Sequence, residues 1–143
     1  IYNEIGCILM KQRKIEQAVQ IFEKAIQEND SLSIFTVNCA NAHRRLGNYK
    51  RAIELLNGVI EKEPENLNAI LSLAFALHLT DRCDEAIEKY NKVLSLSPEN
   101  EFAIAMLEDA VQVVSSNPII LYMPSLENVD VAQDEFMEWK NNQ

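Results

Sequence analysis

A 34-residue repeat is the feature that most constrains the fold of this 143-residue chain. A small residue recurs at the first repeated position, which is occupied by Gly6, Ala40 and Ala74. Twelve residues later an alanine recurs, at Ala18, Ala52 and Ala86. Four residues after each alanine a bulky side chain follows, from Phe22, Leu56 and Tyr90. The rows end at Asp30, Pro64 and Pro98. Self-similarity at a fixed period indicates stacked units, none of which buries its core alone.

Each row is predicted to be a pair of helices. The chain has only three Gly and four Pro, and further apolar residues at helical spacing supply the rest of the core: Ile5, Leu9, Leu46, Ile53, Leu73, Leu77 and Ile87. The small residue of the first helix meets the alanine of the second and allows a close crossing, because a larger side chain would separate the helices. Helices of about 13 residues are marginal alone, so stacking of neighbouring pairs must stabilise the fold.

The spacing of these residues resembles that of the tetratricopeptide repeat (TPR) family. Three consecutive repeats follow without a break in register, over residues 1–32, 33–66 and 67–98, the last reaching 100 at most. The resemblance implies an all-α fold. We therefore expect a TPR α-solenoid of three helix-turn-helix repeats, followed by a capping helix and a C-terminal tail.

A fourth row begins in register and then departs from it. Phe102, Ile104 and Leu107 continue the helical pattern, but Glu108 stands where a small residue is required and Pro118 falls early in the next helix. Residues 99–115 are therefore predicted to be a single capping helix. Its polar residues Glu108, Asp109 and Gln112 are expected to keep part of its surface in water.

The tail, residues 116–143, is predicted to contain one short amphipathic helix. Asp130 and Gln133 resemble a capping box, and Ala132, Phe136 and Trp139 fall on one helix face. Two interpretations remain open for this helix. It packs on the end of the array, or it is a docking peptide for another protein.

Charge and cysteine content exclude several classes of protein. The net charge of -9 and the scattered basic residues disfavour nucleic acid as a partner. No apolar run approaches the roughly 18 residues that a membrane span needs. The three cysteines lie far apart without a C-x-x-C pair, which favours reduced thiols and an intracellular location, in the nucleus, the cytoplasm or both. Because the chain opens at Ile1 inside a helical pattern, we expect it to be a fragment of a longer protein.

No constellation of catalytic residues is present in the sequence. His43 and His78 are isolated, with no i+4 histidine and no nearby cysteine pair, and phosphate-binding and nucleophile-elbow motifs are absent. The sequence therefore predicts a protein that is not an enzyme, with no cofactor and no metal.

The concave face of the array is the candidate partner-binding groove. In TPR arrays the first helix of each repeat lines this face, which here carries Asn38, Asn41, Arg44, Arg45, Asn68, Leu71, Ser72, Phe75, His78, Phe102 and Met106. Asparagine both donates and accepts hydrogen bonds, so Asn38, Asn41 and Asn68 could hold the main chain of a peptide. Phe75 and Met106 offer apolar contact. The alternative is that these positions are ordinary solvated helix faces.

Co-chaperone TPRs grip a C-terminal carboxylate with lysine, arginine and asparagine side chains, because a carboxylate needs charge-assisted donors. The matching positions here are Asn3, Cys7, Asn38, Asn68 and Ser72. Only Asn38 fits, which argues against that role.

A finer resemblance concerns a scaffold subunit of the anaphase-promoting complex, the Cdc-sixteen type. "NCANAHRRL" at 38–46 is similar to the N-x-G-x-x-x-R-[KR]-L of its C-terminal TPRs, and "ENEFAIAMLEDAVQV" at 99–113 is similar to its last TPR helix. The chain departs from the pattern of that subunit in two ways. It lacks the insertion after the first repeat, and it has Ala40 in place of glycine.

The resemblance implies a non-catalytic scaffold in a ubiquitin ligase of cell-cycle control, whose groove encloses the N-terminus of a small helical subunit or contacts other TPR subunits. The alternative is a general peptide-binding TPR adaptor of another assembly, such as ciliary transport or RNA processing.

Overall fold

The computed structural model describes residues 1–29 and 31–115, and this part of the chain consists of seven α-helices without a strand. They are α1 (Tyr2–Lys11), α2 (Ile15–Glu28), α3 (Ser33–Arg45), α4 (Tyr49–Lys62), α5 (Leu67–Leu79), α6 (Cys83–Leu96) and α7 (Glu101–Val114). The predicted all-α class is confirmed. The row end at residue 30 and the predicted tail at 116–143 lie outside the described residues.

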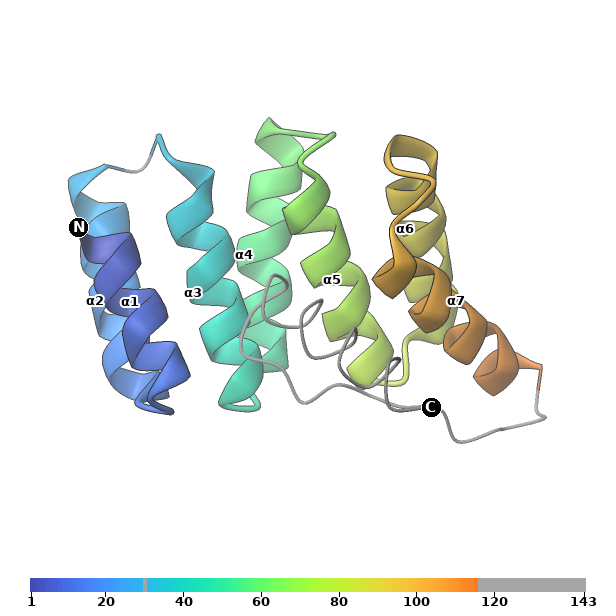
Figure 1. The fold of residues 1–143 in the computed structure, drawn as a ribbon, viewed down its shortest axis with the longest axis horizontal. Helices are drawn as coiled ribbons and strands as arrows, with labels where there is room; N and C mark the ends of the chain where they lie inside the picture. The colour runs from blue at the N-terminus through green and yellow to red at the C-terminus, as the bar shows by residue number, and fades with distance from the viewer. Residues whose placement is uncertain (30, 116–143) are drawn as a thin grey trace.

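The helices stand side by side in one row, with α1, α3, α5 and α7 in one layer and α2, α4 and α6 in the other (Figure 1). The main contacts join consecutive helices, from α1 with α2 through to α6 with α7. Weaker contacts join α1 with α3, α3 with α5 and α5 with α7. Each helix is therefore held by its near neighbours along the row, as in a solenoid.

The residues of the 34-residue pattern form the helix crossings. Ala18, Ala40, Ala52, Ala74 and Ala86 are completely buried. At the first crossing the ring of Phe22 lies directly on Gly6, so closely that an added Cβ at Gly6 would collide with it. Phe22 is the bulky residue one turn after Ala18, which is itself completely buried.

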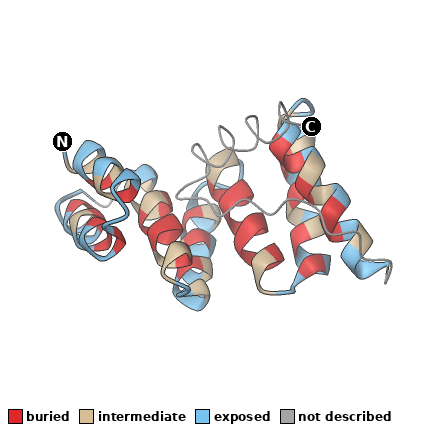
Figure 2. Cartoon of the chain, turned by 60° about the horizontal axis from the view of Figure 1, so that its bottom comes forward, coloured by how far each residue is buried: buried red, intermediate tan, exposed pale blue. Residues whose placement is uncertain are grey.

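The buried side chains form two clusters. The smaller one joins α1, α2 and α3 around Met10, Phe22 and Cys39. The larger one extends from α3 to α7 and includes Leu56, Phe75 and Tyr90. Figure 2 shows buried residues along the inner sides of the helices and around most of α5 in the middle of the array. One predicted core residue was wrong, because Ile5 is 40% exposed on α1, which among the described helices contacts mainly α2.

The turn within each repeat follows the same backbone path. One residue per turn has a positive φ, namely Arg13 at 62°, Gly47 at 83° and Asp81 at 61°, at positions 34 residues apart. Glycine adopts this left-handed conformation freely, whereas a side chain there costs roughly 1 to 2 kcal/mol, less for aspartate. The turn is therefore relaxed in the second repeat and strained at Arg13.

The connections between repeats differ in the capping of the next helix. The side-chain oxygen of Asn66 accepts from the Ala69 N–H at 3.0 Å, and that of Asn100 accepts from the Ala103 N–H at 2.9 Å. Leu32 occupies the equivalent position before α3 and makes no side-chain cap. An asparagine cap stabilises a helix by about 1 kcal/mol relative to an apolar residue.

None of the helices in the described part of the chain combines the length and apolar character required to cross a membrane. α7 ends the described array and packs mainly on α6. The expectation that Asp109 of α7 lies in water was wrong, because this residue is only 5% exposed.

Candidate binding face

The predicted groove residues lie on three helices of one layer, which are α3, α5 and α7. Within each helix they are spaced by one, three or four residues, which places most of them on a common face. We call this set, from α3, α5 and α7, the candidate binding face. Asn38, Arg45 and Asn68 are partly exposed. The other eight are buried: Asn41, Arg44, Leu71, Ser72, Phe75, His78, Phe102 and Met106. Their binding role stays a prediction.

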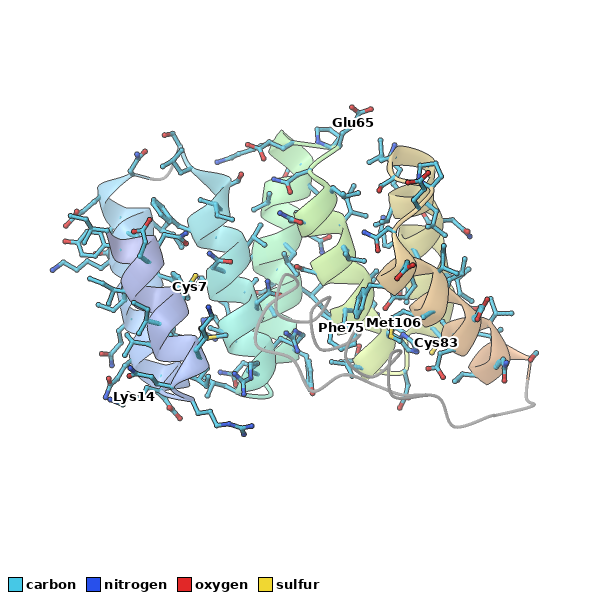
Figure 3. The ribbon with its side chains drawn as sticks, in the orientation of Figure 1. Cys7, Lys14, Glu65, Phe75, Cys83 and Met106 are labelled. Atoms are coloured by element: carbon cyan, nitrogen blue, oxygen red, sulfur yellow. The ribbon has the colours of Figure 1, made fainter. Side chains whose placement is uncertain are left out.

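A stack of one cation and two aromatic rings forms the centre of this face. The Arg44 guanidinium lies 4.9 Å from the centre of the Phe75 ring, and the Phe75 and Phe102 rings meet edge to face at 5.6 Å. Phe75 on α5 and Met106 on α7 belong to one core cluster (Figure 3). Burial, followed by the charge of Arg45, lowers the pKa of Arg44 to about 10, so the guanidinium keeps its charge at neutral pH. The stack joins three helices of the same layer.

Among the described residues, the face contains buried acceptor atoms without a hydrogen-bond donor. Asn41 and Ser72 are 2% and 1% exposed, and within the part of the chain described here the Asn41 Oδ1 and the Ser72 Oγ are unpaired. A buried polar group without a partner costs about 1 to 3 kcal/mol. Both atoms could accept a hydrogen bond from an incoming N–H group.

Asn38 and Arg45 connect the face to the first repeat. The Asn38 Nδ2 donates to the Asn3 Oδ1 at 2.6 Å, and the Arg45 Nη1 donates to the Met10 carbonyl at 3.4 Å. These contacts bridge α1 and α3. Asn38 is therefore already used in holding the helices, as well as being placed at the edge of the face.

His78 belongs to a buried network that the sequence did not predict. Its Nε2 donates to the Asp109 Oδ2 at 2.8 Å, and its Nδ1 accepts from the Tyr90 hydroxyl at 3.2 Å. Burial lowers the pKa of His78, although Asp109 opposes that shift. Burial, and secondly Asp109, raises the pKa of Tyr90. The neutral imidazole thus links α5, α6 and α7, and the 31-residue separation from Asp109 explains why no local pattern revealed it.

A second cluster that sequence reasoning missed lies between α2 and α3. The side chains of Glu23, Cys39 and His43 place their ligand atoms within 4.8 Å of one another, the only such group of three or more found among the described residues. Burial, followed by the charge of Glu23, raises the pKa of Cys39 to about 12. The signal was present in the sequence, because Cys39 and His43 are four residues apart and share a helix face.

A family model described as "Anaphase-promoting complex, cyclosome, subunit 3" matches residues 11–93, more than half of the chain. The chain belongs to this family. The family is of the TPR type, so the predicted membership among TPR proteins is confirmed. No curated protein sequence matches the chain.

Solved structures confirm the TPR solenoid fold. The first TPR domain of human RPAP3 is similar with a TM-score of 0.78 and 24% identity, over 82% of this chain and 92% of that one. The first TPR of Spaghetti (RPAP3) bound to the HSP90 peptide SRMEEVD has a TM-score of 0.76 and 24% identity, over 80% and 90%. MamA AMB-1 has a TM-score of 0.66 and 19% identity, over 96% and 72%.

Proposed function

We propose that this chain is a non-catalytic scaffold segment whose candidate binding face receives a peptide or a small helical subunit within the anaphase-promoting complex. The family match supports the assembly, and the TPR fold supports the kind of interaction. Solenoids present extended concave surfaces to their partners. The scaffold would thus act inside the cell by positioning another subunit of a ubiquitin ligase.

The observation that carries the proposal is the pair of unpartnered acceptors, Asn41 Oδ1 and Ser72 Oγ, on the same layer as the Arg44, Phe75 and Phe102 stack. A main chain supplies N–H donors at regular intervals, so a bound segment could satisfy both atoms. The aromatic rings are buried, so an apolar side chain of that segment would reach them only after a small opening between α3, α5 and α7. Main-chain pairing gives affinity, and the apolar contacts give specificity.

The composition of α5 supports the same conclusion. Its residues, LNAILSLAFALHL, include no Asp, Glu, Lys or Arg, and every residue from Ala69 to His78 is buried. Phe75 faces Arg44 of α3 and Phe102 of α7, and Leu71 and Ser72 lie one turn earlier on that side. A helix that is apolar all round must be covered all round. The unpaired acceptors Asn41 Oδ1 and Ser72 Oγ therefore lie in a desolvated part of the array, where a missing hydrogen bond is costly.

A co-chaperone role is the competing function, since the Spaghetti TPR has the same fold and is bound to an HSP90 peptide. The chemistry at the matching positions disfavours it here. None of the matching residues is cationic; they are Asn3, Cys7, Asn38, Asn68 and Ser72. The Asn38 amide already donates to Asn3. A peptide carboxylate would find no charge-assisted donor at these five positions.

The test measures binding of two labelled peptides to the purified full chain by fluorescence anisotropy. One peptide is the N-terminal segment of a small helical subunit of the anaphase-promoting complex from the same organism, and the other is SRMEEVD. We expect the first peptide to bind and the second to bind at least about ten-fold more weakly. Equal or tighter binding of SRMEEVD would replace the proposal with the co-chaperone function.

Ser72→Ala separates a binding residue from a structural one. Removing a buried hydroxyl without a partner should leave the melting temperature unchanged or raise it. The same change should weaken peptide binding about three- to ten-fold, which corresponds to a lost hydrogen bond of roughly 0.5 to 1.5 kcal/mol. Asn57→Ala, on the exposed side of α4, is the matched control. If both variants bind the peptide as the parent does, the candidate binding face is not the site.

A further inference from the structure

The boundary between the first and second repeats carries a set of side chains of the kind that ligates transition metals. Glu23 comes from α2, and Cys39 and His43 come from successive turns of α3. Their carboxylate, thiol and imidazole ligand atoms all lie within 4.8 Å of one another. This cluster is separate from the candidate binding face, so its existence does not depend on the proposed function.

The spacing of these atoms is close to that of a tetrahedral metal site. Ligand atoms at ~2.1 Å from a tetrahedral ion lie about 3.4 Å apart. The His43 Nε2 and the Glu23 Oε1 are already 3.7 Å apart. The remaining separations, up to 4.8 Å, can close by rotation of the Glu23 side chain, which is half exposed.

His43 provides a second, independent indication of a ligand. Its Nε2 atom is buried and has no hydrogen-bond partner among the described residues, although it faces the carboxylate of Glu23. The other ring nitrogen, Nδ1, lies 3.4 Å from the side-chain amide of Asn48. A metal-bound histidine donates the N–H of its second nitrogen to an acceptor, which fixes the orientation of the ring; turning the Asn48 amide about its own axis would place its oxygen, an acceptor, opposite Nδ1.

We propose that Glu23, Cys39 and His43 bind one zinc-type divalent transition-metal ion between the first and second repeats. A set of one sulfur, one nitrogen and one oxygen suits Zn²⁺ or Co²⁺, whereas Mg²⁺ and Ca²⁺ prefer oxygen alone. Three protein ligands leave one coordination position for water, which can enter along the exposed side of Glu23.

Charge and protons balance at such a site. Binding converts the Cys39 thiol into a thiolate and releases its proton to the solvent. The thiolate and the Glu23 carboxylate then neutralise the two charges of the ion. The nearby Arg51 disfavours a cation but favours the thiolate, and this arginine also lies 3.7 Å from Glu54, which screens it.

An ion at this place would connect α2 to α3 directly. The two helices belong to different repeats, and the junction between them lacks the asparagine cap found at the later junctions. A bound ion would therefore stabilise the one of these three junctions that lacks an asparagine cap, by adding a contact that the unfolded chain does not hold in place.

The test adds Co²⁺ alone to the purified, reduced full chain and records the absorption spectrum. We expect one equivalent to produce a thiolate-to-cobalt charge-transfer band and the visible bands of a tetrahedral ion. Zn²⁺ should then displace Co²⁺ and abolish both signals. No thiolate band in the parent chain would overturn the proposal.

Matched variants locate the site. Cys39→Ser should lose the charge-transfer band, while Cys83→Ser, at another buried cysteine at the start of α6 (Figure 3), should keep it. Because Cys39 is a core residue, Glu23→Gln and His43→Gln serve as variants that preserve folding. Each should weaken Co²⁺ binding at least about ten-fold, with an unchanged circular dichroism spectrum. Binding that survives in both glutamine variants, or that is lost in Cys83→Ser, would also overturn it.

Discussion

The first and third repeats share one sequence register but differ in how completely they are built. α1 leaves Ile5 and Ile8 exposed, whereas α5 buries every residue from Ala69 to His78. Among the described helices α1 contacts mainly α2 and, weakly, α3, while α5 contacts α3, α4, α6 and α7. The difference teaches that the repeat pattern defines the fold of each helix pair, and that position in the array decides how much of it is buried.

The largest expected effect comes from truncating the bulky residue of each repeat. Phe22→Ala and Tyr90→Ala both remove a completely buried ring and should each cost about 3 to 5 kcal/mol. The consequences should differ in extent. Phe22 lies at the end of the described array, so its loss should unfold α1 and α2 alone, while loss of Tyr90 should weaken every helix from α5 to α7.

Hydrogen exchange followed residue by residue measures this difference. In the Phe22→Ala variant the amides of α5 and α6 should keep the protection of the parent chain. If exchange in those helices rises as much as it does in α1, the array unfolds as one unit and the two repeats are not independent.

The buried network of the third repeat should give the next largest effect. Asp109→Ala leaves the Nε2–H of His78 without its acceptor, which should cost about 1 to 3 kcal/mol. Glu108→Ala, the exposed neighbour on α7, is the control and should change stability by less than about 0.5 kcal/mol. Urea denaturation measures both, and equal effects would show that the network contributes nothing specific.

The same network should make the third repeat sensitive to acid. Burial lowers the pKa of His78 below its ordinary value of about 6.5, so between about pH 6.5 and that lower value the unfolded chain binds a proton that the folded chain does not. Stability is therefore complete above about pH 6.5 and falls as the pH decreases through this window. Urea denaturation across a pH series should show this fall in the parent chain and a smaller one in His78→Gln.

Supplying the missing helix cap at the junction of the first and second repeats should make its stability more similar to that of the later junctions. Leu32→Asn places a side-chain acceptor at the start of α3, where Asn66 and Asn100 already cap α5 and α7. The helix should gain about 1 kcal/mol. Asn66→Ala is the reverse change and should lose a similar amount. A melting temperature that does not rise in Leu32→Asn would mean that backbone geometry at this junction prevents capping.

The smallest effect is expected at the turn of the first repeat. Arg13→Gly relieves a side chain held at a φ of 62°, while the added freedom of glycine in the unfolded chain offsets part of the gain. We expect a net stabilisation of about 0.5 kcal/mol. Gly47→Ala imposes the opposite change at the equivalent turn and should be destabilising. Melting curves of the two variants together test whether the positive φ at this turn position strains a side chain.

The sequence predicted the helix pairs and most of the core because these follow from residues spaced along a single register. Ala52 and Leu56, for example, are buried for the reason that their spacing suggested. The sequence did not reveal contacts between residues that are far apart along the chain. Asp109 looked like a solvated residue because nothing near it in sequence identifies His78, and the three ligands of the proposed metal site become neighbours only when α2 packs against α3.

On the candidate binding face, the sequence predicted which helices and residues to consider, and that prediction does not include their surroundings. The spacing of Asn41, Ser72 and Phe75 follows from the repeat, whereas the unpaired atoms of the first two and the contact of Phe75 with Arg44 depend on the relative positions of α3 and α5. The asparagine caps could have been read from the sequence, since Asn66 and Asn100 each follow a Pro-Glu pair and precede an apolar run.

The near-neighbour pattern of contacts has a mechanical consequence. Since the main contacts along the described row reach no further than the second helix, a pull on its two ends is transmitted through each interface in series. Such an array should extend elastically, because small rotations at every interface add up to a large change in end-to-end distance. The weakest interface would open first under load, and the others would stay intact until it had given way.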